Sequence, residues 1–201
     1  MPRIKEDVIH SIEIKKSRFI TYLHRSDNEE EAKDFLRYIK KTHADATHHC
    51  TCMIIGSIVR SNDDGEPSGT AGHPMLNVLQ KNGIEDILAV VVRYFGGTKL
   101  GTGGLVKAYS DSVKLALEQA TLTSVVPFFE YKITFDYEWI GKIDAYFHKQ
   151  KLEISKKEYD QKVTYFYLCE QDNQKDIQEL TNGKVQCEFV QEVQKEKIIE
   201  S

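Results

Sequence analysis

The chain has 201 residues, of which 40% are hydrophobic and 29% charged. This is the composition of a globular protein and excludes a disordered or fibrous chain. No apolar run approaches the length of a membrane span and the first ten residues lack a signal-peptide pattern, so we expect a cytoplasmic protein without membrane contact.

The net charge of −4 is unevenly distributed along the chain. Residues 1–125 are neutral, and residues 126–201 carry the whole excess of acidic side chains. A nucleic-acid partner would therefore have to bind at local patches, because the overall charge attracts no polyanion. The four cysteines are scattered in apolar, strand-like contexts, which favours buried thiols over disulfides.

The first 56 residues predict strands around one helix. Alternating residues indicate two short strands over 8–23, with a break near Lys15 and Lys16. A helix is expected over about 28–41, with Ser26 or Asp27 as its cap. Residues 48–56 are typical of a strand, and residues 57–69 are predicted to form a long polar loop.

Two more helices flank a strongly apolar strand. Pro74 suits the first turn of a helix that Gly83 ends. Residues 86–94 are continuously apolar and β-branched, as expected for a strand covered on both faces. Apolar residues then recur at helical spacing from Leu105 to Ala120. The predicted order of this first domain is ββαβαβα.

The second part of the chain predicts another small domain. Its expected elements are a strand from about residue 129, a helix at 138–149, a hairpin around 155–162, a helix at 172–183 and a strand at 185–193. The order βαββαβ is the ferredoxin-like arrangement. We predict an α+β protein with two domains, over residues 1–125 and 126–201.

The segment YFGGTKLGTGG, residues 94–104, concentrates five glycines between the apolar strand and a helix. Unpaired N–H groups near Gly103, Gly104 and Leu105 would face this loop and could bind an anion. The residues predicted to bind the anion or a nucleic acid are Arg93, Tyr94, Gly96, Gly97, Thr98, Lys99, Gly101, Gly103, Gly104 and Lys107.

The alternative is that these glycines only let a tight loop pass close to a neighbouring element. Gly104 is followed by Leu105, so the loop is no Walker A motif, and Val106 breaks the dinucleotide fingerprint.

A second polar cluster, NDDGEPSGTAGHP at 62–74, is predicted to form the rim of the same site. Its chemistry-bearing side chains are Asp63, Asp64, Glu66, Ser68 and Thr70. The carboxylates could hold Mg²⁺ or act as a base. They could instead form a solvated turn that pairs with Arg93 or Arg60, and Ser68 and Thr70 could be helix caps.

Histidines and cysteines gather between residues 43 and 52. Adjacent His48 and His49 would face opposite sides of a strand, and no second motif completes a zinc site, so we predict no metal and no cofactor. In the second domain Tyr165 and Tyr167 could stack RNA bases, but core packing is the favoured interpretation.

Four segments resemble a bacterial member of the YigZ/IMPACT family: KSRFI (16–20), HADATHHC (43–50), DDGEPSGTAGHPML (63–76) and VVVRYFGGTKLGTGGLVKAY (90–109). The resemblance implies a first domain of the ribosomal protein S5 domain 2-like type and a ferredoxin-like second domain, as in the last two domains of elongation factor G. It also implies a role in translation, since the eukaryotic relative restrains a starvation-responsive kinase by competing for its activator.

Three functions are compatible with these observations. The first is a translation-associated regulator that binds RNA or the ribosome through the glycine-rich loop. The second is an enzyme or sensor that binds a phosphometabolite or nucleotide there. The third is a module that binds a translation or stress factor, with the acidic second domain as its docking face. The sequence favours a binding protein over an enzyme and assigns no catalytic residue.

Overall fold

The structure, a computed structural model, describes residues 1–199 and divides into two units. Unit 1 comprises Met1–Ser124, and unit 2 comprises Val125–Lys197. Ile198 and Ile199 group with unit 1, where the Ile199 N–H donates to the Leu122 carbonyl at 2.9 Å. The boundary predicted from the sequence instead assigns every residue after 125 to the second domain.

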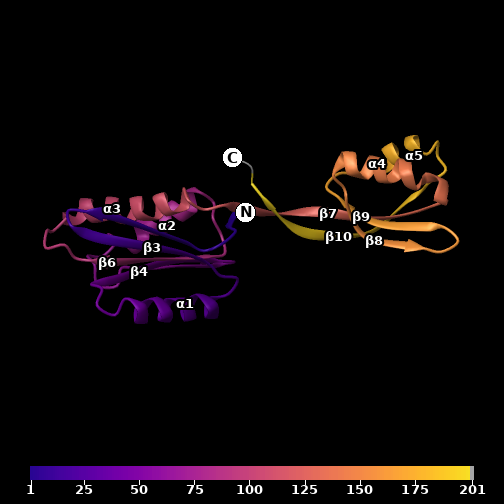
Figure 1. The fold of residues 1–201 in the computed structure, drawn as a ribbon. Helices are drawn as coiled ribbons and strands as arrows, with labels where there is room; N and C mark the ends of the chain where they lie inside the picture. The colour runs from indigo at the N-terminus through magenta and orange to yellow at the C-terminus, as the bar shows by residue number, and fades with distance from the viewer. Residues whose placement is uncertain (200–201) are drawn as a thin grey trace. The chain divides into compact units, whose positions relative to one another are not determined.

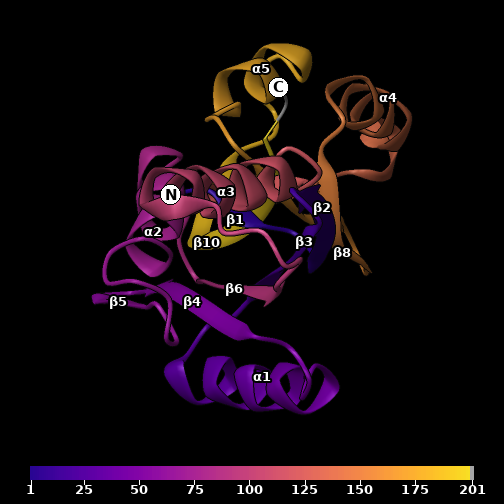
Figure 2. The same ribbon diagram turned by 90° about the vertical axis from the view of Figure 1, so that its left-hand side faces the viewer.

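Unit 1 contains strands and helices in the order ββ-β-α-ββ-α-β-α. They are β1 (Arg3–Ile4), β2 (Val8–Ile14), β3 (Ser17–Arg25), α1 (Glu29–Thr42), β4 (His48–Ile55), β5 (Ile58–Asn62), α2 (Gly72–Lys81), β6 (Ile87–Tyr94) and α3 (Gly101–Leu117). The antiparallel sheet has the order β2-β3-β6-β4-β5. Helix α1 covers one face, and α2 and α3 cover the other (Figures 1 and 2).

Strand β6 lies at the centre of this sheet and is apolar on both faces, as predicted. Its odd-numbered residues from Ile87 to Val91 pack under α2 and α3. Its even-numbered residues from Leu88 to Val92 pack under α1. The alternation continues to the end of the strand, so that neighbouring Arg93 and Tyr94 face opposite sides of the sheet.

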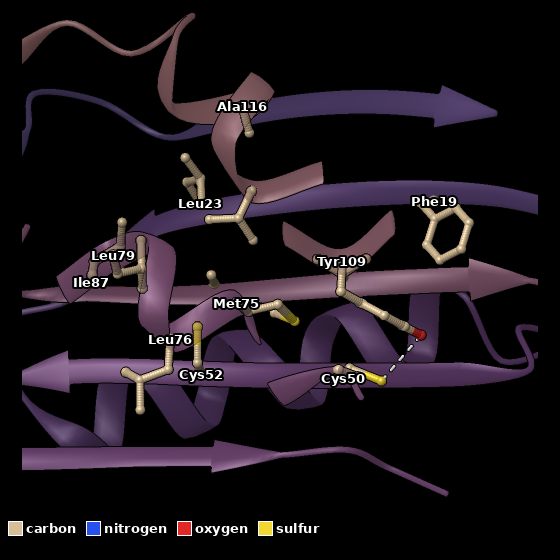
Figure 3. Packing of buried hydrophobic residues seen from close by; sticks show 14 of the residues in the cluster. Phe19, Leu23, Cys50, Cys52, Met75, Leu76, Leu79, Ile87, Tyr109 and Ala116 are labelled. Atoms are coloured by element: carbon tan, nitrogen blue, oxygen red, sulfur yellow. Dashed lines mark hydrogen bonds between the residues drawn. The ribbon is translucent and has the colours of Figure 1, made fainter. Parts of the chain in front are cut away.

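The main core of unit 1 lies between the sheet and helices α2 and α3 (Figure 3). Met75 and Leu79 of α2 are fully buried there, as is Tyr109 of α3. The Tyr109 ring meets Phe19 edge to face at 5.3 Å, and its hydroxyl reaches toward Cys50 (Figure 3). The Tyr109 side chain thus places its hydroxyl beyond the apolar core, near one end of the sheet.

Two predictions about local structure in unit 1 were wrong. Residues 58–62 are strand β5 and not loop, because Gly56 takes a φ of +54° and lets the chain turn back so that Ile58 pairs with Ile55. The cap of α1 is Asn28, whose side-chain oxygen accepts from the Glu31 N–H at 2.9 Å, rather than Ser26 or Asp27.

Unit 2 is a four-stranded antiparallel arrangement with two helices on one face of its sheet (Figure 1). Its elements are β7 (Leu122–Phe135), which begins in unit 1, a short 3₁₀ turn η1 (Tyr137–Trp139), α4 (Ile140–Gln150), β8 (Glu153–Tyr159), β9 (Val163–Cys169), α5 (Gln174–Leu180) and β10 (Cys187–Ile198). Strand β7 pairs with both β9 and β10, and β8 pairs with β9. This is the ferredoxin-like order that the sequence predicted.

The tyrosines of β9 are core residues. Tyr165 and Tyr167 are fully buried under α4, where Phe147 contacts both rings. They are closed to RNA bases, and the core interpretation of the sequence is confirmed. Within residues 1–199 no helix is long and apolar enough to cross a membrane.

Candidate functional site

A hollow of about 400 Å³ opens in unit 1 where four segments meet. The start of β4 contributes His48, the turn after β5 contributes Glu66, and the end of β6 contributes Arg93 and Phe95. The fourth segment is the glycine-rich loop with the first turn of α3, including Lys99 and Thr102. The glycine loop and the acidic turn are therefore brought together, as the sequence predicted.

An ion pair between Arg93 and Glu66 forms the floor of the hollow. The two side chains are 6% and 3% exposed, and Arg93 Nη1 donates to Glu66 Oε1. The Arg93 guanidinium also lies 5.4 Å from the Phe19 ring and 5.6 Å from the Phe95 ring. Arg93 lines the hollow as predicted, but its charge is paired with Glu66, which is the alternative that the sequence also offered for the acidic turn.

Two further side chains extend the polar network into the core. The Tyr109 hydroxyl donates to Glu66 Oε1 at 2.8 Å. The Cys50 thiol lies 3.3 Å from the same hydroxyl (Figure 3). Burial raises the pKa of Cys50 to about 12, so the thiol stays protonated and is no nucleophile at neutral pH.

His48 lines the hollow beside Glu66 and was considered in the sequence only as a metal ligand. Its Nδ1 lies 2.9 Å from the Asp64 backbone carbonyl, which can only accept a hydrogen bond. The proton of the neutral ring is therefore on Nδ1, and Nε2 carries a lone pair. Nε2 lies 3.8 Å from Glu66 Oε2.

The glycines of the loop have different roles. A Cβ on Gly96 would lie 2.0 Å from the Lys16 carbonyl carbon, so Gly96 lets the chain just after β6 pass directly against the turn between β2 and β3. Gly97 and Gly101 take φ values of +83° and +74°. A Cβ added to Gly103 would meet nothing within 4 Å, whereas one added to Gly104 would lie 3.1 Å from the Leu100 side chain.

Of the three amides predicted to be unpaired at the start of α3, only that of Gly103 is so. The helix begins at Gly101 and no side chain caps it. The N–H groups without an intrahelical acceptor are those of Gly101, Thr102 and Gly103, whereas Gly104 and Leu105 lie far enough inside the helix to bond its first carbonyls. Gly101 and Thr102 line the hollow, so this positive helix end faces it.

The remaining predicted binding residues divide between the hollow and other surfaces. Lys99 is exposed and lines the hollow, and Thr98 is an exposed neighbour. Lys107 is exposed on α3 but does not line the hollow. Tyr94 lies on the opposite face of the sheet, where its hydroxyl is 2.7 Å from His43 Nδ1, so its predicted place in the site was wrong.

Asp63 and Asp64 hold the turn together instead of facing a ligand. Asp63 accepts backbone N–H bonds from Gly69, Ala71 and Gly72 at 2.7–3.0 Å. Burial raises its pKa, but these three donors outweigh burial and hold the pKa below the ordinary 3.8. Asp64 accepts the His49 N–H at 2.6 Å and pairs with Lys40.

The two hydroxyls of the predicted rim are also used differently from each other. Thr70 is buried, and its hydroxyl donates to the Pro67 carbonyl at 2.6 Å, as expected of a turn or cap residue. Ser68 is exposed on the same turn. Glu66 alone of the five predicted rim residues lines the hollow. Across residues 1–199, no group of three or more His, Cys, Asp or Glu side chains is placed to hold a metal ion.

Comparison with known proteins places the chain in one family. The family model described as the Impact N-terminal domain matches residues 15–117, and that of a domain of unknown function, DUF1949, matches residues 133–184. IMPACT family member YvyE of Bacillus subtilis is 42% identical over 188 residues, which cover 90% of this chain and 87% of that protein.

A second relative is IMPACT family member YigZ of Escherichia coli, 49% identical over 138 residues that cover 66% of this chain and 68% of the relative. A crystal structure of a hypothetical protein is similar, with a TM-score of 0.60 at 36% identity over 94% of this chain and 97% of that chain.

The fold therefore defines the class as a two-domain α+β protein in which an S5 domain 2-like unit precedes a ferredoxin-like unit. Within that class, the chain belongs to the IMPACT family.

The buried ion pair gives the first prediction. Replacing Glu66 by Gln leaves the Arg93 guanidinium buried without a counter-charge, which should lower the free energy of unfolding by about 3–5 kcal/mol. Urea denaturation measures this change. Ser68→Ala on the exposed part of the same turn is the matched control and should change stability by less than about 0.5 kcal/mol. A Glu66→Gln variant as stable as the native protein would contradict the assigned role of the pair.

The glycine contacts give the second prediction. Gly96→Ala forces a methyl group into the Lys16 backbone and should cost about 1–3 kcal/mol or more. Gly103→Ala lies in open space within a helix and should be neutral or stabilise by up to about 1 kcal/mol. Thermal unfolding of the two variants compares them directly, and equal losses would disprove this division of roles.

The Asp63 carboxylate gives a pH-dependent prediction. Its pKa is lower in the folded protein than in the unfolded chain, so its stabilisation is complete well above pH 3.8 and is lost as the pH falls through the folded value. Asp63→Asn should thus cost about 1–3 kcal/mol at pH 7. The difference from the native protein should shrink below pH 3.8. Urea titrations at several pH values test this, and a difference that is constant with pH would refute it.

Proposed function

We propose that this protein is a translation-associated regulator that binds RNA, free or in the ribosome, through the hollow at the start of α3. The observation that carries the proposal is the open helix end: Gly101 and Thr102 line the hollow, and no side chain caps the first turn of α3. Such an end binds the oxygens of a phosphate.

Two exposed side chains beside this helix end suit an RNA strand. Lys99 supplies the positive charge that Arg93, paired with Glu66, does not. Phe95, directly after β6, is 48% exposed, and the part of its ring that Arg93 does not cover can stack on an unpaired base. Phosphate, charge and base contacts are thus offered within one hollow.

The charge distribution limits what this site does alone. Among residues 1–199, Lys99 is the one lysine that lines the hollow, with Lys107 farther along α3, and residues 1–125 as a whole are neutral. Binding should therefore be moderate and local, touching few phosphates. This is consistent with a protein that recognises a particular exposed strand rather than coating RNA. The family resemblance to the last two domains of elongation factor G supports a site of action in translation.

A second candidate function is binding of a small phosphorylated metabolite or nucleotide. The volume of about 400 Å³ lies within the range of small-ligand pockets, and the same helix end would take its phosphate. A thermal-shift panel of nucleotides and sugar phosphates identifies such a ligand by a rise in melting temperature.

Replacing Lys99 by Ala tests the RNA proposal. Affinity for a mixed-sequence single-stranded RNA should fall by up to about fivefold, since one exposed charge contact is lost. The slope of log K against log salt should become shallower by about 0.7. Fluorescence anisotropy at several salt concentrations measures both quantities.

Lys41→Ala is the matched control, because Lys41 is an exposed lysine on α1, across the sheet from the hollow. It should leave affinity and slope unchanged. Equal RNA affinity of the native protein and the Lys99→Ala variant, with an unchanged slope, would reject the hollow as the RNA site.

A further inference from the structure

We propose that the hollow selects guanine, so that its ligand is a guanine nucleotide whose base contacts Glu66 and His48 while its phosphate lies at the start of α3. This inference rests on the proposed function and names the base that the RNA site recognises. The ligand is defined by a guanine base joined to a phosphate, either within an RNA strand or as a free nucleotide.

The first acceptor is the second carboxylate oxygen of Glu66. Oε1 is occupied by both Arg93 Nη1 and the Tyr109 hydroxyl. Oε2 accepts no hydrogen bond from any residue among 1–199, and His48 Nε2 lies 3.8 Å from it, a contact that is an ion pair only when the ring is protonated. Because Glu66 lines the hollow, a ligand or water there can donate a hydrogen bond to this oxygen.

The second acceptor is Nε2 of His48. In the neutral ring the Asp64 carbonyl fixes the proton on Nδ1, which leaves a lone pair on Nε2. Nε2 lies 3.8 Å from Glu66 Oε2, and the two form an ion pair instead when the ring is protonated. With the ring neutral, two acceptors therefore lie 3.8 Å apart in the hollow. They suit a flat ligand that presents two neighbouring N–H donors.

Among the four RNA bases only guanine has such an edge. Its Watson–Crick edge presents N1–H and the N2 amino group next to each other, whereas adenine and cytosine place a lone pair beside their amino group, and uracil has a single N–H between two carbonyls. The acceptor pair therefore favours guanine. With any other base, one of the two acceptors would face a lone pair of the base instead of an N–H group.

The outer parts of the hollow complete a nucleotide site. The exposed Phe95 ring supplies a surface on which the base can stack. The start of α3 at Gly101 and Thr102, together with Lys99, supplies the phosphate contacts in the same hollow. The hydrogen bonds to the base, the stacking surface and the phosphate contacts come from separate segments that all line the same hollow.

The test uses the unmodified protein and changes the ligand. Short oligouridine RNAs with one central guanosine, inosine or adenosine are compared by fluorescence anisotropy. The guanosine RNA should bind about tenfold tighter than the adenosine RNA. The inosine RNA, which lacks only the N2 amino group, should fall between them. Equal affinity for all three overturns the inference, and the proposed function stands if Lys99→Ala still weakens binding.

A variant arm tests the assigned acceptor. His48→Ala should lose most of the preference for guanosine over adenosine while keeping its dependence on salt. His73→Ala, an exposed histidine on α2, is the control and should keep the preference. Retained preference in His48→Ala would overturn the role of His48, and urea denaturation of both variants confirms that each is folded.

Competition by free nucleotides distinguishes the two sources of the ligand. Displacement of the guanosine RNA by GMP and not by AMP supports the guanine site. If GMP binds selectively and no RNA binds at all, the guanine inference holds and the proposed RNA function fails. If neither GMP nor the guanosine RNA binds better than its adenine counterpart, the guanine inference fails.

Discussion

The site depends on one buried ion pair, formed by Glu66 and Arg93. Glu66 comes from the turn after β5 and Arg93 from the end of β6, and the same carboxylate receives the Tyr109 hydroxyl from α3. Glu66 Oε1 therefore joins three segments that are distant in sequence: the turn after β5, the end of β6 and helix α3. A buried pair contributes little net stability compared with apolar packing, but losing one partner is costly. Its effect is to fix where the turn and α3 lie, and hence where the hollow opens.

Backbone contacts around the ion pair also fix where the turn and α3 lie. Asp63 accepts three N–H groups of the turn, and Gly96 allows the segment after β6 to pass against the Lys16 backbone before the chain enters α3. Because no side chain caps α3, its first amides remain available at the wall of the hollow. Asp63 and Asp64 are thus structural, whereas the start of α3, Lys99, Phe95, Glu66 and His48 line the hollow.

Much of the fold was predictable because its signals are local. The apolar run of β6, the helical spacing in α3 and the order of unit 2 all follow from patterns among neighbouring residues. Strand β5 was missed although Gly56 lies between two apolar pairs, a hairpin signal that the polar residues after it obscured. The site was less predictable. Tyr94 faces away because of strand alternation, and the neutralisation of Arg93 depends on a contact between residues 27 positions apart. The role of His48 depends on a carbonyl in another segment, which residue types alone do not reveal.

The account as a whole requires that phosphate oxygens meet the open end of α3. An NMR titration of the ¹⁵N-labelled protein with a short single-stranded RNA tests this at the level of single amides. We expect the largest chemical-shift changes at the N–H groups of Gly101, Thr102 and Gly103, with smaller changes at the neighbouring loop. Saturating RNA that leaves these three amides unmoved, or that shifts a different surface instead, would contradict the assignment of this hollow as the binding site.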